Sequence, residues 1–413
     1  MIRALFGQVA LLLTALFLGG ALVLPYNGGF VLAYALMALT IVLVLSLLVA
    51  RGRWEIGPAG WCFLAAFALI AVAFSVDGDW KMAVNFIFLL AFVPLASWLR
   101  RFAAPDSAVV VSWLALVGSV LSTVAALVQI FVFEQKRALG WWSDPIWSAE
   151  AALILGFLAL MAVPVMRSRW RYVLLLGPAL GLGIVFLSGS RGPLLATPVI
   201  LLVLVLTTFR SWWKPLLAGF VVLVLAGALV LPFAPGQMKR VERIGTVVVQ
   251  LLTTGSVDEN SAGSRVAFWK ASFEAFIDRP LTGYGWSKRV KSAYKYLPEG
   301  GKEYDRRGNP LHGNHHLHAD ILDMGVSGGI MGLLAYGLIL LAPLLGAVRS
   351  VRDGQSSARL TGALVLSVGY AACGLSYLMF GYEFHTTLYV CLCAIVLGFC
   401  RDEPARPRVS RAG

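Results

Sequence analysis

Four of the five histidines in the chain lie within seven residues, at positions 312–318, immediately before an apolar segment. An imidazole changes charge near neutral pH, so it can accept a proton from an attacking hydroxyl as a general base. His315 and His318 stand three residues apart and would share a face if a helix began at this point. We therefore take His315 and His318 as candidate catalytic bases at a membrane surface.

Two other interpretations of the histidine cluster are open. His315, His318 and Asp320 would suit a zinc ion, but the sequence has no His-Glu-x-x-His pattern and no distant carboxylate in a suitable context. The cluster is otherwise a polar turn at the membrane boundary. We expect no metal and no cofactor, and we count Asp320 as a possible supporting residue.

The sequence SGSRGP at residues 188–193 places Arg191 at the end of an apolar segment. The glycines and the proline predict an interrupted helix with exposed backbone N–H groups, and an arginine at this depth needs a partner or water. Arg191 is therefore a candidate ligand for an anion, with Ser190 as a possible supporting residue. The alternative is an arginine that snorkels to lipid headgroups.

A second candidate anion site begins an amphipathic helix predicted over residues 264–278. A helix N-terminus and the forked guanidinium of Arg265 both favour phosphate, with Ser264 in support. The alternative is that Ser264 only caps the helix and Arg265 lies in solvent. The helix is predicted from large apolar residues at helical spacing, namely Trp269, Phe273, Phe276 and Ile277.

A basic stretch with interleaved aromatic residues follows this helix. Lys288 and Arg289 lead it, and we count both as possible supporting residues for anion binding. Lipid headgroups or anionic sugars are the expected partners, whereas nucleic acid is not expected outside the cell.

The composition places most of the chain in lipid. Of its 413 residues, 59% are hydrophobic and 13% are charged, and the mean hydropathy is +0.80. Long, uniformly apolar runs exclude the alternating strands of a barrel, so the fold class is an all-α polytopic membrane protein of about twelve transmembrane helices. The expected spans are residues 6–24, 29–50, 58–76, 81–98, 108–133, 149–166, 172–188, 193–209, 215–234, 319–346, 359–380 and 384–400.

The distribution of Lys and Arg among the connections predicts the orientation. Arginine-rich connections are expected in the cytoplasm, with both termini on that side. Residues 1–234 then form transmembrane helices one to nine, residues 235–314 a periplasmic helical insertion, residues 315–400 helices ten to twelve, and residues 401–413 a cytoplasmic tail. The segment from Ala234 to Asn314 holds 13 Lys and Arg against 8 Asp and Glu, for which phosphate affinity is one reason.

Taken together, these motifs resemble the O-antigen ligase and polymerase superfamily of bacterial envelope enzymes. The superfamily pattern of histidine, a small polar residue, nine residues and Gly-x-x-Gly is matched from His318 to Gly332, although Ala319 departs from it. His315 is the alternative equivalent. Residues 265–285 are similar to the superfamily's stretch of arginine, aromatic, proline and glycine, and Arg191 resembles its other arginine motif.

The resemblance implies a GT-C-like, inverting and metal-independent glycosyltransferase in the bacterial inner membrane, with its active site facing the periplasm. It implies a glycan donor linked to undecaprenyl diphosphate and, for the ligase, a lipid A-core sugar as acceptor, with membrane lipids around the protein. Arg191 and Arg265 would bind the diphosphate, and His315 or His318 would be the base. The sequence contains no nucleotide-binding loop, so the energy would come from the donor.

Other functions remain open on the sequence alone. Within the superfamily, an O-antigen polymerase or a protein O-oligosaccharyltransferase would differ only in the acceptor. From another class, a transporter or flippase would show a similar number of spans, but it would place ionisable residues near the bilayer midplane. A structural or assembly protein of the membrane would leave the histidine cluster unexplained.

Overall fold

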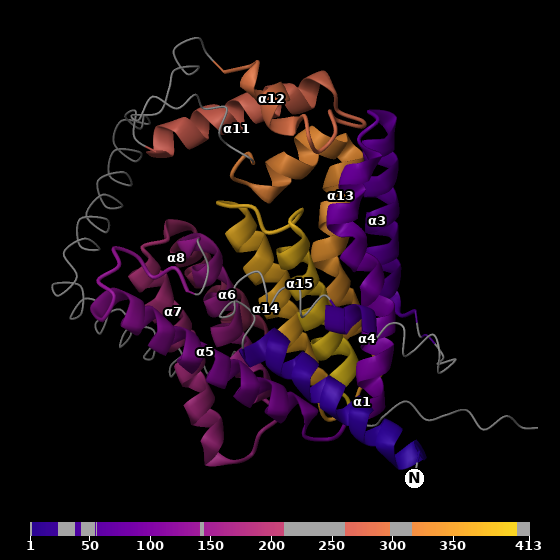
Figure 1. The fold of residues 1–413 in the computed structure, drawn as a ribbon, viewed down its shortest axis with the longest axis vertical. Helices are drawn as coiled ribbons and strands as arrows, with labels where there is room; N and C mark the ends of the chain where they lie inside the picture. The colour runs from indigo at the N-terminus through magenta and orange to yellow at the C-terminus, as the bar shows by residue number, and fades with distance from the viewer. Residues whose placement is uncertain are drawn as a thin grey trace, which may run out of the picture.

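The computed structural model describes residues 2–23, 38–42, 54, 56–140, 144–209, 261–297 and 316–402. These residues form helices and connections, without a strand among them, so the predicted all-α class is confirmed. Figure 1 shows a bundle of helices with α11 and α12 lying across one end of it.

The first part of the bundle runs to residue 209. Its elements are α1 (Ile2–Leu18) with η1 (Gly19–Val23), α3 (Pro58–Val76), η2 (Trp80–Ala91) leading into α4 (Phe92–Leu99) and η3 (Arg100–Phe102), α5 (Ser107–Phe131), α6 (Pro145–Leu158) with η4 (Ala159–Ala162), η5 (Arg169–Leu175) leading into α7 (Leu176–Ser188), and α8 (Arg191–Thr207).

The second part follows after residue 260. Its elements are α11 (Ser261–Asp278), α12 (Arg289–Tyr294), α13 (Asp320–Val348), α14 (Ser356–Gly374), and α15 (Glu383–Ala394) with η10 (Ile395–Phe399). The predicted amphipathic helix is therefore present, and it begins at Ser261 rather than at Ser264.

Six segments of the described chain are long and apolar enough to cross a membrane. They are Pro58–Val76, Trp80–Phe102, Ser107–Phe131, Pro145–Ala162, Arg169–Ser188 and Asp320–Val348. The chain is thus a protein with several membrane-spanning segments, whereas the number of twelve is not confirmed. The expected span 215–234 and most of 29–50 lie outside the described residues.

Small residues let the helices approach closely, as is usual when helices associate in lipid. Gly156 of α6 faces Gly177 of α7, and a Cβ atom on either glycine would lie 2.4 Å from the carbonyl oxygen of the other. α3 packs along α13, and the buried core runs through the bundle.

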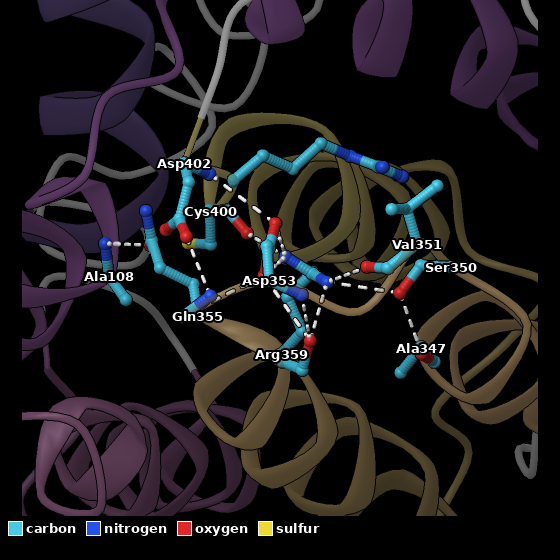
Figure 2. A network of polar contacts seen from close by, with 12 residues as sticks. Ala108, Ala347, Ser350, Val351, Asp353, Gln355, Arg359, Cys400 and Asp402 are labelled. Atoms are coloured by element: carbon cyan, nitrogen blue, oxygen red, sulfur yellow. Dashed lines mark hydrogen bonds and ion pairs between the residues drawn. The ribbon is translucent and has the colours of Figure 1, made fainter.

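Arginine-bearing connections meet at one end of the bundle, shown in Figure 2. The side chain of Arg359 is fully buried and donates to both carboxylate oxygens of Asp353 at 2.7 Å and to the carbonyl of Cys400 at 2.9 Å. Gln355 accepts from the backbone N–H of Ala108 and donates to the carbonyl of Ala104. These bonds join the α4–α5 and α13–α14 connections to the end of η10.

At the other end, the insertion docks on a kink in α13. Gly329 adopts φ 58° and ψ −145°, which breaks the helical ladder and turns the carbonyls of Val326 and Ser327 outward. The backbone N–H groups of Tyr284 and Gly285 donate to these two carbonyls at 2.9 Å each. The N–H of Ile330 donates in turn to the carbonyl of Pro280 at 2.7 Å.

Glycine is required in this contact. A Cβ atom on Gly329 would lie 2.4 Å from the carbonyl carbon of Leu281, and one on Gly283 would lie 2.5 Å from the carbonyl oxygen of Val326. The Pro-Gly stretch and the Gly-x-x-Gly pattern of the sequence are therefore two sides of one backbone contact, which fixes the insertion to the bundle.

Candidate functional site

The arginine turn between α7 and α8 is a break in the helix, as the sequence predicts. Gly189 ends α7 with φ 64°, Ser190 has an extended backbone, and α8 begins at Arg191. The first backbone N–H groups of a helix have no partner within it and carry partial positive charge. The half-buried guanidinium of Arg191 stands at this terminus, and no described residue accepts a hydrogen bond from it.

A second arginine, which the sequence analysis missed, supports this turn. Arg137 donates from Nε to the carbonyl of Ser188 at 2.6 Å and from Nη2 to the hydroxyl of Ser190 at 3.5 Å. The Ser190 hydroxyl donates to the carbonyl of Pro145 at 3.2 Å. The break is thus tied to the start of α6, and two guanidinium groups lie close to it. The signal available in the sequence was Arg137 itself, a basic residue in the connection at 134–148, which holds few others.

The α14–α15 connection lies against this turn. A Cβ atom on Gly192 would lie 1.9 Å from the hydroxyl oxygen of Ser376, so the backbone of α8 touches that connection. The next residue, Tyr377, donates its hydroxyl to Oδ2 of Asp144 at 2.8 Å, while Oδ1 of Asp144 caps α6 by accepting from the N–H of Ile146. Burial, and then the charge of Asp144, raise the pKa of Tyr377, so its hydroxyl stays protonated and donates.

Two histidines pack on the same tyrosine. The ring of His316 lies 4.6 Å from that of Tyr377 and 4.3 Å from that of His318, edge to face in both cases. His318 is half-buried, and its backbone N–H donates to Nδ1 of His316 at 3.2 Å. The arginine turn, Tyr377 and His318 are thereby linked through the α14–α15 connection.

The conformation of His318 corrects one expectation. The helix does not extend back from residue 320, because α13 begins at Asp320 and His318 has φ 59°, a left-handed conformation that is rare for residues other than glycine. His318 therefore does not lie in the helix, and His315 lies outside the described residues. Such backbone strain persists only where the surrounding structure holds it, and it is frequent at functional sites.

Two buried carboxylates hold the histidine segment in place. Asp320 accepts at Oδ1 from the N–H groups of Met379 and Phe380 at 2.8 Å and 3.2 Å. Asp323 accepts from the N–H of Leu317 at 2.9 Å and pairs with the buried guanidinium of Arg289 at 2.5 Å. Both carboxylates position the chain around His318.

The remaining predicted residues are placed as follows. Arg289 is held by Asp323 and lies over the ring of Trp286, at 3.7 Å from its centroid. Exposed Lys288 donates to the carbonyl of Asp77 at 3.2 Å. The backbone of Ser264 and Arg265 lies in the first turns of α11, and their side chains are outside the described part of the structure. Whether Arg265 approaches Arg191 thus stays a prediction.

One further acid lies inside the bundle near this end. Glu150 of α6 is fully buried, and neither of its carboxylate oxygens has a hydrogen-bond partner in the described chain. An ionisable residue within a membrane span is a functional candidate by default. The sequence analysis missed Glu150 because it looked for charges at helix ends.

Comparison with known proteins bears on this arrangement. Residues 176–337 match the family described as O-antigen ligase. A curated O-antigen ligase of Escherichia coli (strain K12) is 22% identical over 231 residues, which cover 55% of this chain and 52% of that protein. The predicted resemblance to the O-antigen ligase superfamily is confirmed.

The region that matches the O-antigen ligase family runs from the start of α7 to the middle of α13. It therefore includes the turn at Arg191, helix α11 with Arg265, and the segment at His318. The chain spans about half the length of the curated relative it matches.

Proposed function

We propose that this protein is a membrane glycosyltransferase of the O-antigen ligase type. It moves a glycan from undecaprenyl diphosphate to a hydroxyl of a lipid A-core sugar. The observation that carries the proposal is that one connection, at Ser376 and Tyr377, contacts both the helix N-terminus that carries Arg191 and the strained His318. The first group suits a diphosphate and the second suits a hydroxyl that must lose its proton.

The anion side of the site consists of the start of α8, Arg191 and, by proposal, Arg265. When the bond between the sugar and the diphosphate breaks, negative charge develops on the leaving oxygen. Fixed guanidinium groups and helix N–H groups stabilise that charge without having to reorganise. Arg137 stabilises the turn through its hydrogen bonds to the carbonyl of Ser188 and the hydroxyl of Ser190. This arrangement supports catalysis without a metal ion, as the resemblance implies.

The base side consists of His318, with His315 as the alternative. The acceptor hydroxyl gives its proton to the imidazole, its oxygen forms a bond to the anomeric carbon, and undecaprenyl diphosphate leaves from the opposite face. The configuration at that carbon is inverted. The imidazolium then returns its proton to water. His316 and Tyr377 limit the positions that the His318 ring can adopt.

The proposed setting is the bacterial inner membrane with the site facing the periplasm. The α7–α8 connection, the α14–α15 connection and the start of α13 lie toward the end of the bundle that carries the insertion (Figure 1), and the connections joined by Arg359 lie at the other end. This separation supports the predicted orientation, because basic connections are retained in the cytoplasm.

The test is transfer by purified protein in vesicles that contain an undecaprenyl-diphosphate-linked glycan and a lipid A-core acceptor, with and without a chelator. Arg191→Ala, Arg265→Ala and His318→Ala should each lower the rate about a hundredfold, the scale of losing one preorganised group. Arg169→Ala, an exposed arginine at the start of η5, is the matched control and should leave the rate unchanged. His315→Ala separates the two candidate bases.

Three outcomes would replace the proposal. Normal transfer in the Arg191, Arg265 and both histidine variants would exclude the mechanism. Lengthening of the glycan without use of the lipid A-core would favour a polymerase, and transfer to protein would favour an oligosaccharyltransferase. Movement of the donor across the bilayer without bond formation would favour a flippase.

A further inference from the structure

Helix α11 has two apolar faces, and among the described residues one of them packs against the protein while the other is largely exposed. Phe268, Ala271 and Ala275 are buried in a small core with Tyr284 and Leu317. The residues on which the helix was predicted lie largely on another face. Trp269, Phe273 and Ile277 are 39%, 56% and 54% exposed, and Leu281 continues the row at 70%.

The position of these residues around the helix is regular. Each residue advances about 100° around the axis, so Trp269, Phe273 and Ile277 form a narrow row. We call Trp269, Phe273, Ile277 and Leu281 the apolar row. Exposed polar residues, Lys270, Glu274 and Asp278, border it on one side. A large apolar row beside a charged row is the pattern of a helix that lies in a membrane interface.

The first argument for a lipid occupant is continuity with a membrane span. α13 is long and apolar enough to cross a membrane. Beyond its kink, one side of α13 exposes apolar residues that would face lipid: Ile330, Leu334, Leu341, Leu345 and Val348. Leu281 of the apolar row lies directly after Pro280, whose carbonyl accepts from the N–H of Ile330. The exposed apolar surface therefore passes from the span onto the insertion.

The second argument is the depth, relative to the membrane surface, at which the insertion is bound to the bundle. The span α3 ends at Val76, and the turn after it binds the insertion: Asp77 pairs with Arg279 at 3.0 Å, and Asp79 accepts from the N–H of Ser287 at 2.7 Å. Figure 1 shows α11 lying across the bundle at this end. The end of a span marks the membrane surface, so α11 is held at the depth of the headgroups.

The third argument is charge. Lys270 borders the apolar row, and Lys288, Lys291 and Lys295 are exposed later in the same insertion. Exposed lysines near an apolar row match the phosphates of anionic lipids. Among the described residues of the insertion, exposed acids near this row are Glu274 and Asp278 alone.

From these observations we infer that the apolar row of α11 lies in the outer leaflet of the bilayer, with the neighbouring lysines on lipid phosphates. This inference does not depend on the proposed reaction. Its consequence is that the insertion is anchored on both of its apolar faces, one to protein and one to lipid. The turn at Leu281 would then meet the membrane where α13 enters it.

Depth measurement by spin labelling tests the inference. Single cysteines replace Phe273 and Ile277 in the apolar row, and Lys270 and Glu274 beside it as matched controls. The five native cysteines are buried, so labelling of the unchanged protein measures the background. The full chain is reconstituted in vesicles of phosphatidylethanolamine and phosphatidylglycerol, and collisions with oxygen, which enters lipid, are compared with collisions with a water-soluble nickel chelate.

We expect labels at 273 and 277 to meet oxygen more than nickel, and labels at 270 and 274 to show the reverse order. Nickel access at all four positions would place the row in water and overturn the inference. Spin–spin broadening at 273 that disappears on dilution with unlabelled protein would show that a second copy covers the row. Labels at 273 and 277 that are immobile and closed to both probes would show that protein covers it. Because no transfer is measured, none of these results depends on the catalytic proposal.

Discussion

The two ends of the bundle each contain a central arginine, and they use it in opposite ways. Arg359 is fully buried, and its donors are met by Asp353, Ser350, Val351, Ser356 and the carbonyl of Cys400 (Figure 2). Arg191 is half-buried at a helix N-terminus, and no described residue accepts from it. The difference teaches that a guanidinium saturated by its own chain holds structure, whereas one with unused donors is available to a ligand.

The strongest test of this comparison exchanges the two arginines for alanine in separate variants. Arg359→Ala should lower the free energy of unfolding by about 3–5 kcal/mol, because it removes a fully buried guanidinium and leaves half-buried Asp353 and the carbonyl of Cys400 without their partner. Arg191→Ala should keep the stability of the parent protein and lower glycan transfer about a hundredfold. Denaturant unfolding in detergent and transfer in vesicles measure the two effects.

The conservative variant Arg359→Lys is the control, since it keeps the charge but has fewer donors, and it should fall between the parent and Arg359→Ala. If Arg191→Ala destabilised the protein as much as Arg359→Ala, the comparison between the two ends would fail.

A second test concerns the contact that fixes the insertion. Gly329→Ala places a Cβ atom against Leu281 and forces a side chain into a glycine conformation. We expect a loss of about 1–3 kcal/mol from the backbone strain, with overpacking in addition, and faster proteolysis of the insertion. Gly337→Ala is the matched control on the same helix, because nothing lies within 4 Å of its Cβ position. Equal stability of the two variants would contradict the docking role of Gly329.

A third test sharpens the base side of the site. Tyr377→Phe removes the hydroxyl that donates to Asp144, and a hydrogen bond to a charged group is worth about 1.5–3 kcal/mol. Because the lost hydrogen bond affects the reaction only through the position of the His318 ring, the rate of transfer should fall about threefold to tenfold. The carboxylate of Asp144, no longer bonded to a hydroxyl, then favours the protonated form of the His318 imidazole. On the acid side, the rate of transfer should therefore begin to fall at a higher pH than in the parent protein. A profile that keeps its position would show that Tyr377 acts only in packing.

The smallest expected effect is a dependence of stability on pH at the Arg359 end. Burial acts to raise the pKa of Asp353, but the hydrogen bonds and charge of Arg359 outweigh it and lower that pKa below its usual value of 3.8. The stabilisation by this pair is therefore present above pH 3.8 and is lost as the pH falls through the lowered value. We expect about 1 kcal/mol, since Asp353 is partly exposed. Asp353→Asn should flatten this part of the curve in thermal unfolding.

The sequence predicts the helices of this fold well and the contacts between them poorly. The expected span at residues 58–76 coincides with α3, because length and uniform hydrophobicity define a span directly. The burial of α11 could not be predicted from the same pattern. The row of Trp269, Phe273 and Ile277 is exposed, and the face of Phe268, Ala271 and Ala275 packs instead, because the partners of a helix outside the bundle depend on the fold.

The same distinction holds for the site. The break at Arg191 was predictable because glycine and proline act locally. The roles of Asp144 and Tyr377 were not, because these residues lie 233 positions apart and meet only after the helices have packed. The left-handed turn at His318 was also hidden, since nothing at that position in the sequence requires it.

Asp323 bonds simultaneously to the Arg289 side chain of the insertion and to the N–H of Leu317, which lies between the two described histidines. One carboxylate thus holds two segments of the chain together. Replacing Arg289 or Asp323 alone would leave the other side chain buried without its ionic partner. We expect Arg289 and Asp323 to be inherited as a pair, so that natural variation at one position is accompanied by compensating variation at the other.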